Sequence, residues 1–248
     1  MVDGLQIDTF HYLRPGCRKI AFLGQSALSK ENMTKGLPFF FRNSWVEELS
    51  CSTVIFNDPT LYLYRKLAAG WSQGSPAQFG IPAMGKVCDS YVAAVAAATG
   101  CTTPEISFGF YGSSAGGFWA LFMAALYGAP CVIETPQTDM FAYPLEPPRE
   151  ELFDRCYRDH GLDPAEYRHR LRAVDWFDHL GRHPARIDYY QSDRDHGHIE
   201  TQLRPFEAAM AGRPCPLKVG YYKRAEDKMA HGPMGKKASL AAIHSLFD

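Results

Sequence analysis

One segment limits the fold of this chain more than any other: the turn Gly112-Ser113-Ser114-Ala115-Gly116, which joins two apolar runs. The run before it, ISFGFY over 106–111, is rich in aromatic residues and predicts a buried strand. The run after it, 118–127, is almost wholly apolar and stops at Gly128, which predicts a helix buried against a sheet. A buried strand, a tight turn and a buried helix in this order are typical of a parallel sheet covered by helices.

Other short apolar runs alternate along the chain with longer stretches of helix-forming residues. They predict strands over 20–23, 53–56, 131–133, 187–190 and 217–221, and a helix over 87–99 that ends at Gly100. The alternation predicts an α/β fold in which a mostly parallel sheet is flanked by helices. With 248 residues, 46% of them hydrophobic, we expect one domain over 1–248. The aromatic residues include Trp45, Trp71, Trp119 and Trp176, and most of the aromatic side chains are expected in the core.

The segment 144–178 has a different composition from the rest of the chain. It carries two consecutive prolines, Pro147 and Pro148, followed by the charged stretches REELFDRCYRDH and EYRHRLR. Charged stretches of this length predict two short surface helices. We expect them to form a small cap over the functional site.

Composition excludes several classes of protein. The formal net charge is -1 and the sequence has no dense run of Lys or Arg, so we expect no nucleic-acid partner. Residues 1–9 lack the pattern of a signal peptide, and the apolar stretches are too short for a transmembrane helix. The seven cysteines are odd in number, far apart and without a C-x-x-C pair. These features predict a reduced, cytoplasmic protein without structural zinc.

Ser114 occupies the third position of G-x-S-x-G, between a predicted strand and a predicted helix. A sharp turn there exposes the serine hydroxyl, and the N–H of Ala115 faces the start of the helix, where it can stabilise an oxyanion. We therefore predict Ser114 as a nucleophile and Ala115 as an oxyanion donor. Ser113 is the nearest rival but stands one position too early. The alternative is a plain connecting turn or a phosphate-binding loop.

A serine nucleophile needs a base and an orienting carboxylate, and both are expected in loops after later strands. After the predicted strand 187–190 comes the polar turn QSDRDHGH, in which Asp195 is our candidate acid and Asp193 the reserve. The alternative for Asp195 is a turn residue that binds its own backbone. His196 and His198 could form a metal site with these two carboxylates, but no third distant ligand is visible, so we predict no metal. We expect the two histidines to be supporting or surface residues.

The base is expected in the loop after the last predicted strand, where His231 precedes Gly232-Pro233 and a final helix-like stretch. Other histidines precede the serine, fall in or next to the charged segment, or lie in the terminal helix: His11, His160, His169, His179, His183 and His244. His231 is therefore the candidate base, and the alternative is an ordinary loop histidine. A second oxyanion donor is expected after the strand 20–23, where Gln25 and Ser26 are the candidates and a plain turn is the alternative.

Together these segments resemble the α/β-hydrolase superfamily from about Lys19 to the C-terminus. The runs FNDPTLYLY, GWSQG, YGSSAGGFWA and YYQSDRDHGHIETQLRPF resemble bacterial capsule-polysaccharide O-acetyltransferases and related enzymes of surface-glycan assembly. The resemblance implies that Ser114 accepts an acetyl group, Asp195 orients the base and His231 acts as that base. It also implies a small-molecule acyl donor such as acetyl-coenzyme A, a glycan acceptor and no required cofactor.

Three functional hypotheses follow. The first is an O-acetyltransferase or esterase that works through an acyl-serine intermediate on a polysaccharide or another glycan. The second is a non-catalytic protein that uses the hydrolase fold for binding, as a scaffold in a glycan or secretion assembly. The third is a small-molecule ester hydrolase or a peptidase, which would share the same triad.

Overall fold

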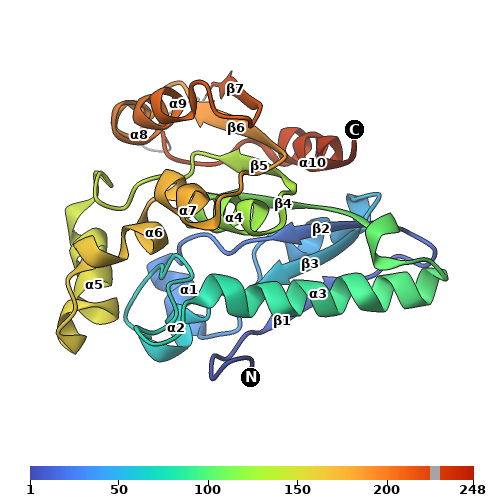
Figure 1. Ribbon diagram of the computed structural model, residues 1–248, viewed down its shortest axis with the longest axis horizontal. Coiled ribbons are helices and arrows are strands. Elements are labelled where there is room, and N and C mark those ends of the chain that lie inside the picture. Colours follow the sequence, from blue (N-terminus) through green and yellow to red (C-terminus); the bar gives the residue numbers. More distant parts are fainter. Residues whose placement is uncertain (224–229) are drawn as a thin grey trace.

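The computed structural model describes residues 1–223 and 230–248. A seven-stranded sheet runs through the middle of the molecule, in the order β1-β3-β2-β4-β5-β6-β7, with helices on both faces (Figure 1). The strands are β1 (Thr9–Tyr12), β2 (Lys19–Leu23), β3 (Ser52–Phe56), β4 (Ser107–Ser113), β5 (Pro130–Glu134), β6 (Arg186–Ser192) and β7 (Leu217–Tyr222). Only β1 pairs antiparallel with its neighbour, and the other strand pairs are parallel. The prediction of a mostly parallel sheet flanked by helices is confirmed.

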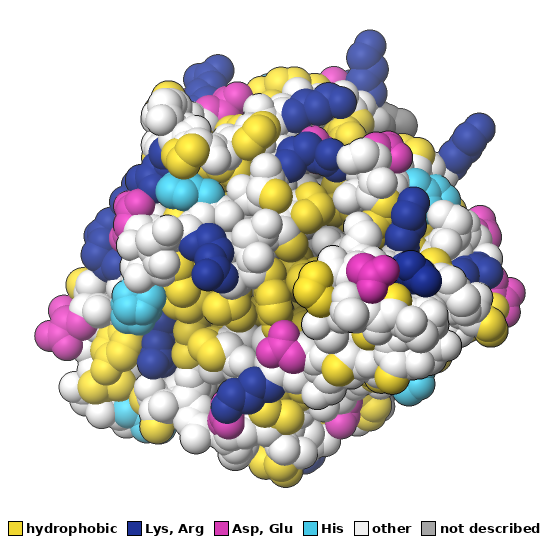
Figure 2. Space-filling view, turned by 45° about the vertical axis from the view of Figure 1, so that its right-hand side comes forward, with side chains coloured by type: hydrophobic (Ala, Val, Ile, Leu, Met, Phe, Trp, Pro, Cys, Tyr) yellow, Lys and Arg dark blue, Asp and Glu magenta, His cyan; other side chains and the backbone are white. Residues whose placement is uncertain are grey.

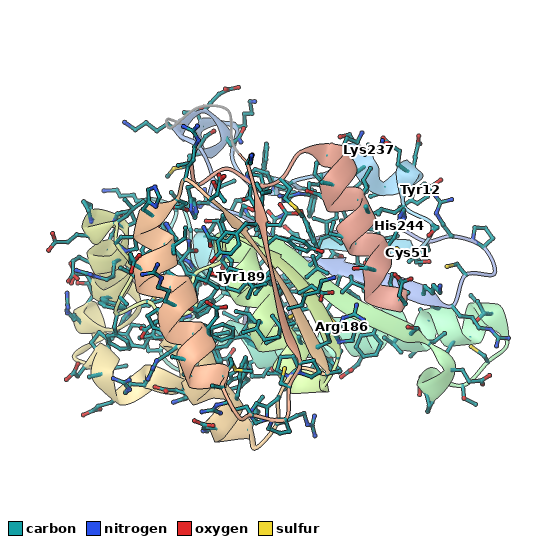
Figure 3. All side chains as sticks on the ribbon, turned by 90° about the horizontal axis from the view of Figure 1, so that it is seen from above. Tyr12, Cys51, Arg186, Tyr189, Lys237 and His244 are labelled. Carbon is teal, nitrogen blue, oxygen red and sulfur yellow. The ribbon has the colours of Figure 1, made fainter. Side chains whose placement is uncertain are left out.

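The helices form two unequal layers. One face of the sheet is covered by α3 (Gly80–Thr99), α4 (Ala115–Tyr127), α7 (Ala173–Leu180) and α9 (Arg204–Met210). The other face is covered by α10 (Lys236–His244) together with the segment around Val46. Figure 3 shows α10 crossing this face, with His244 beside Cys51, and the Nε2 atom of His244 accepts the backbone N–H of Ser50 at 3.1 Å.

Two predicted boundaries differ from the structure. The helix expected over 87–99 already starts at Gly80, because proline is tolerated in a first helical turn and Pro82 lies there. Gly80 has no room for a side chain, since a Cβ atom would lie 2.4 Å from the carbonyl oxygen of Ser72. The antiparallel edge strand β1 was not expected. Thr9, Phe10 and Tyr12 favour strands, but the four residues are only partly buried and do not form a continuous apolar run.

The predicted cap segment divides into two parts. Its first part forms α5 (Glu146–Cys156) and α6 (Arg168–Leu171), which lie at the end of the molecule toward which the parallel strands point (Figure 1). Its last part belongs to α7, where the Trp176 ring stacks on Phe122 with 5.7 Å between centroids. Residues 173–178 therefore belong to the layer that covers the sheet. That α5 and α6 cover the site stays a prediction.

All seven cysteines have free thiols. Five are buried, and burial raises the pKa of Cys51 and that of Cys215 to about 11. In the remaining buried thiols, Cys88, Cys131 and Cys156, burial raises the pKa as well.

The face of the molecule shown in Figure 2 carries charges of both signs. Lys and Arg side chains lie interspersed with Asp and Glu over the face shown in Figure 2, without an extended patch of one sign. Within residues 1–223 and 230–248, no helix combines the length and the apolar character needed to cross a membrane.

Candidate active site

Ser114 lies at the turn between β4 and α4 in a strained backbone conformation. Its φ is 52° and its ψ is -122°, a region that residues with a side chain rarely adopt. Its N–H donates to the carbonyl oxygen of Glu134 at 2.9 Å, which ties the turn to the end of β5. Gly112 is required at this turn, because a Cβ atom there would lie 2.0 Å from the carbonyl oxygen of Gly116. The strained serine between strand and helix has the geometry of a nucleophile elbow.

The structure brings Ser114, His231 and Asp195 together from three distant segments. The Oγ atom of Ser114 lies 2.9 Å from Nε2 of His231, and Nδ1 of His231 lies 2.7 Å from Oδ2 of Asp195. Asp193, the reserve acid, makes no such contact, and its backbone N–H donates to the carbonyl oxygen of Tyr222. Of the two candidate acids, the geometry thus places Asp195 on the histidine.

The loop that carries His231 is fixed to the sheet by several hydrogen bonds. The hydroxyl of Tyr222 donates to the carbonyl oxygen of Gly232 at 2.8 Å. The backbone N–H of Met234 donates to the carboxylate of Glu134 at 3.0 Å. Glu134 is fully buried and also accepts the hydroxyl of Tyr111 at 2.8 Å. The histidine loop is therefore anchored at the end of β5, beside the turn that carries the serine.

Three further residues complete the surroundings of the triad. The Nδ1 atom of His198 lies 2.9 Å from Oδ1 of Asp195, and its ring stacks on that of His231 with 4.0 Å between centroids. The Nε2 amide of Gln137 lies 3.3 Å from Oγ of Ser114 and 3.3 Å from Nε2 of His198. The indole N–H of Trp71 donates to Oε1 of Gln137 at 3.0 Å. His198 is buried beside the acid, whereas His196 is exposed.

Burial and hydrogen bonds shift the pKa of Asp195 in opposite directions. Burial by itself raises the pKa of its carboxyl group, but the N–H donors of His198 and His231 outweigh burial and hold the pKa well below its usual value. At His198, burial lowers the pKa and so does the neighbouring His231, while Asp195 raises it, with a net lowering. The site therefore favours an ionised Asp195 beside a neutral His198.

Asp195, His198 and His231 offer potential metal-ligand atoms that all lie within 4.8 Å of one another. Each oxygen of the Asp195 carboxylate already faces one imidazole nitrogen at hydrogen-bonding distance. These two hydrogen bonds account for the close approach of the three side chains, so we assign no metal to them.

The loop after β2 lies directly against the start of α4. A Cβ atom on Gly116 would lie 2.7 Å from the carbonyl oxygen of Gly24 and 3.1 Å from that of Gln25. The side chains of this loop bind elsewhere: Gln25 accepts the N–H of Asp58, and the Ser26 hydroxyl lies 2.8 Å from that of Ser113. In the described part of the chain, the N–H groups of Gln25, Ser26 and Ala115 donate no hydrogen bond. That these N–H groups receive an oxyanion beside Ser114 stays a prediction.

The strand order, the helical layers and the strained serine turn define the α/β-hydrolase fold, and comparison with solved structures agrees. A capsule O-acetyltransferase of Neisseria meningitidis serogroup A is similar with a TM-score of 0.64 and 13% identity, over 100% of this chain and 91% of that chain. An S-formylglutathione hydrolase from Agrobacterium tumefaciens is similar with a TM-score of 0.58 and 15% identity, over 99% of this chain and 94% of that chain. An acetyl xylan esterase from Paenibacillus sp. R4 is similar with a TM-score of 0.59 and 15% identity, over 98% of this chain and 80% of that chain.

At these identities the similarity establishes the fold. No protein-family model matches the sequence, and no curated protein matches it either.

Proposed function

We propose that this protein is a serine-dependent acyl-transfer enzyme in which Ser114 is the nucleophile, His231 the general base and Asp195 the orienting acid. The observation that carries the proposal is the chain of hydrogen bonds from Ser114 through His231 to Asp195 at a strained strand-to-helix turn. Both the order of the three residues along the chain and their mutual distances fit this chemistry.

In the first step, His231 takes the hydroxyl proton of Ser114 while Oγ attacks the acyl carbonyl carbon. The carbonyl oxygen becomes an oxyanion, which the N–H groups of Ala115 and of Gln25 or Ser26 stabilise. His231 then gives its proton to the leaving oxygen or sulfur, and acyl-Ser114 remains. In the second step a hydroxyl group or water attacks the acyl-serine, with His231 again taking the proton.

We further propose that the acyl group is acetyl and that a glycan carries or receives it. Support comes from two structural neighbours, which are named a capsule O-acetyltransferase and an acetyl xylan esterase. A small-molecule acyl donor, for which acetyl-coenzyme A is the candidate, would serve a transferase. A cytoplasmic location belongs to the same proposal and is supported by the seven free thiols, which suit a reducing compartment.

The test is incubation of the purified protein with an activated acetyl ester, while product release and intact protein mass are followed. Ser107, an exposed serine at the start of β4, provides the matched control. We expect turnover in the wild type and in Ser107→Ala, together with one acetyl adduct more than Ser114→Ala carries, and no turnover in Ser114→Ala. Turnover that persists in Ser114→Ala would contradict the assignment, and a rate increase on adding glycan acceptors would distinguish transfer from hydrolysis.

If neither turnover nor an adduct occurs with a panel of acyl esters, thioesters and peptides, the proposed enzyme activity is wrong. The hypothesis of a non-catalytic scaffold would then replace it.

A further inference from the structure

We propose that His198 is a positioning residue for the acyl transfer at Ser114 and that, with Gln137, it closes a ring of hydrogen bonds around the triad. The ring runs from Ser114 to His231, Asp195, His198 and Gln137 and back to Ser114. This inference rests on the proposed function. It assigns a role to a second histidine that contacts Asp195, in addition to the triad of Ser114, His231 and Asp195.

The directions of the hydrogen bonds at Gln137 and His198 follow from one fixed donor. The Trp71 indole can only donate, so the Gln137 atom that it contacts is the amide oxygen. The Gln137 nitrogen therefore faces both Ser114 Oγ and His198 Nε2 with its two N–H groups. It follows that Nε2 of His198 is an acceptor and that its proton is on Nδ1, where it donates to Asp195.

These hydrogen bonds hold the triad in a form that is ready to react. Asp195 accepts one imidazole N–H on each carboxylate oxygen, and its Oδ1 also accepts the backbone N–H of His198 at 3.4 Å. These hydrogen bonds fix the orientation of the carboxylate. His231 donates from Nδ1 and keeps Nε2 free to accept the Ser114 proton. A second N–H from Gln137 points at Oγ, where negative charge develops as the proton leaves.

Burial makes this arrangement selective for one protonation state. The side chain of Gln137 is fully buried and His198 is 4% exposed, so water cannot replace a lost partner. The titratable groups that face His198 are Asp195, His231 and Tyr143, whose ring centroid lies 5.8 Å away. Burial, together with the charge of Asp195, raises the pKa of Tyr143 to about 12, so Tyr143 stays neutral.

A proton added to Nε2 of His198 would point at the N–H groups of Gln137. It would also place a positive charge on a ring whose centroid lies 4.0 Å from that of His231, which must itself become positive during the reaction. A neutral His198 can thus donate to Asp195 without repelling the imidazolium form of His231.

The test uses two substitutions of His198 and a control two residues away. His198→Phe keeps a ring for the stack and removes both hydrogen bonds, while His198→Asn places a side-chain N–H near the former Nδ1. His196→Asn changes an exposed histidine of the same short helix. We expect His198→Phe to lower kcat by about 10- to 100-fold with little change in KM, since a hydrogen bond to a charged group is lost. His198→Asn should recover part of kcat, and His196→Asn should equal the wild type.

The pH profile separates positioning from a general structural effect. With one N–H donor removed, the Asp195 carboxylate holds the imidazolium form of His231 more strongly, so the acid limb of the kcat/KM profile should move to higher pH in His198→Phe. Loss of activity with an unmoved acid limb, or no loss at all, would overturn the proposal.

A nitrogen-15 NMR measurement on the imidazoles tests the ring without any activity. At neutral pH, His198 should be the neutral form that carries its proton on Nδ1, and Gln137→Met should change its signals. A doubly protonated His198 or the Nε2–H form would overturn the inference even if Ser114 is the nucleophile. Conversely, the expected NMR result in a protein that transfers no acyl group would leave the hydrogen-bonded ring standing and refute only its role in catalysis.

Discussion

Replacing Asp195 by Asn tests how this carboxylate serves two histidines at once. The wild-type side chain accepts one imidazole N–H on each oxygen, at 2.9 Å from His198 and 2.7 Å from His231. Asparagine has one acceptor oxygen and one NH2 group, so one of the two imidazoles must present an unprotonated Nδ1 and carry its proton on Nε2.

The partners at Nε2 decide which imidazole changes. In His198, a proton on Nε2 would meet the N–H groups of Gln137, which cannot accept it. In His231, a proton on Nε2 meets the hydroxyl oxygen of Ser114, which can accept it. We therefore expect His231 to change, and in that form it cannot take the serine proton. The expected loss of kcat is about 10³- to 10⁴-fold, or about 4–5.5 kcal/mol of transition-state stabilisation.

The assay is the steady-state hydrolysis of an activated acetyl ester, with Asp193→Asn as the matched control. Asp193 lies two residues away, and its backbone N–H donates to the carbonyl oxygen of Tyr222, while the hydrogen bond to His231 is made by Asp195. The Asp193→Asn variant should therefore keep most of the activity. A circular dichroism spectrum and a melting curve confirm that both variants fold. If Asp195→Asn stays within tenfold of the wild type, or Asp193→Asn falls as far, the reasoning is refuted.

Three other predictions concern stability and the supporting residues. Gly112→Ala should lower the unfolding free energy by at least about 3 kcal/mol in urea denaturation, because its Cβ atom would lie 2.0 Å from the carbonyl oxygen of Gly116, and near wild-type stability would contradict this. Because the pKa of His198 is lowered on folding, the unfolded chain binds more protons and the unfolding free energy should fall as pH drops below about 6.5. His198→Phe should show a shallower slope there, and an equal slope would speak against the lowered pKa. Trp71→Phe should reduce stability by about 1–3 kcal/mol and also lower kcat, because the buried oxygen of Gln137 loses its donor, and unchanged values of both would refute that role.

Much of the fold could be predicted from sequence because the interior strands are short continuous apolar runs. The predicted strands match β2 to β7 within a few residues. β2 to β6 lie inside the sheet and carry the pattern of parallel strands buried on both faces, whereas β7 is a partly buried edge strand. The edge strand β1 is half exposed and lacks it, so sequence did not reveal it. The start of α3 was missed because Gly80, Pro82 and Gly85 are weak helix formers whose packing against neighbours overrides their propensity.

At the site, sequence could select candidates where a turn motif or a position in the chain order singled them out. Ser114 and His231 had such signals, and in the structure they meet Asp195. Of the two supporting residues, Gln137 had no such signal. Trp71 lies in the run GWSQG, but that run indicated no role for the indole, and tryptophan is most often a core residue. Their roles depend on contacts between segments 66 residues apart, which a linear pattern does not encode.

The buried thiols bear on how an acyl-enzyme can be detected in this protein. Thiolates compete with serine for activated esters, but a thiol whose pKa is about 11 is ionised in only about one molecule in 10⁴ at pH 7. The five buried cysteines should therefore stay unmodified, which leaves Cys17 and Cys101, both partly exposed, as the competing sites. A Cys17→Ser/Cys101→Ser background would thus let one added acetyl mass be read directly as oxygen acylation.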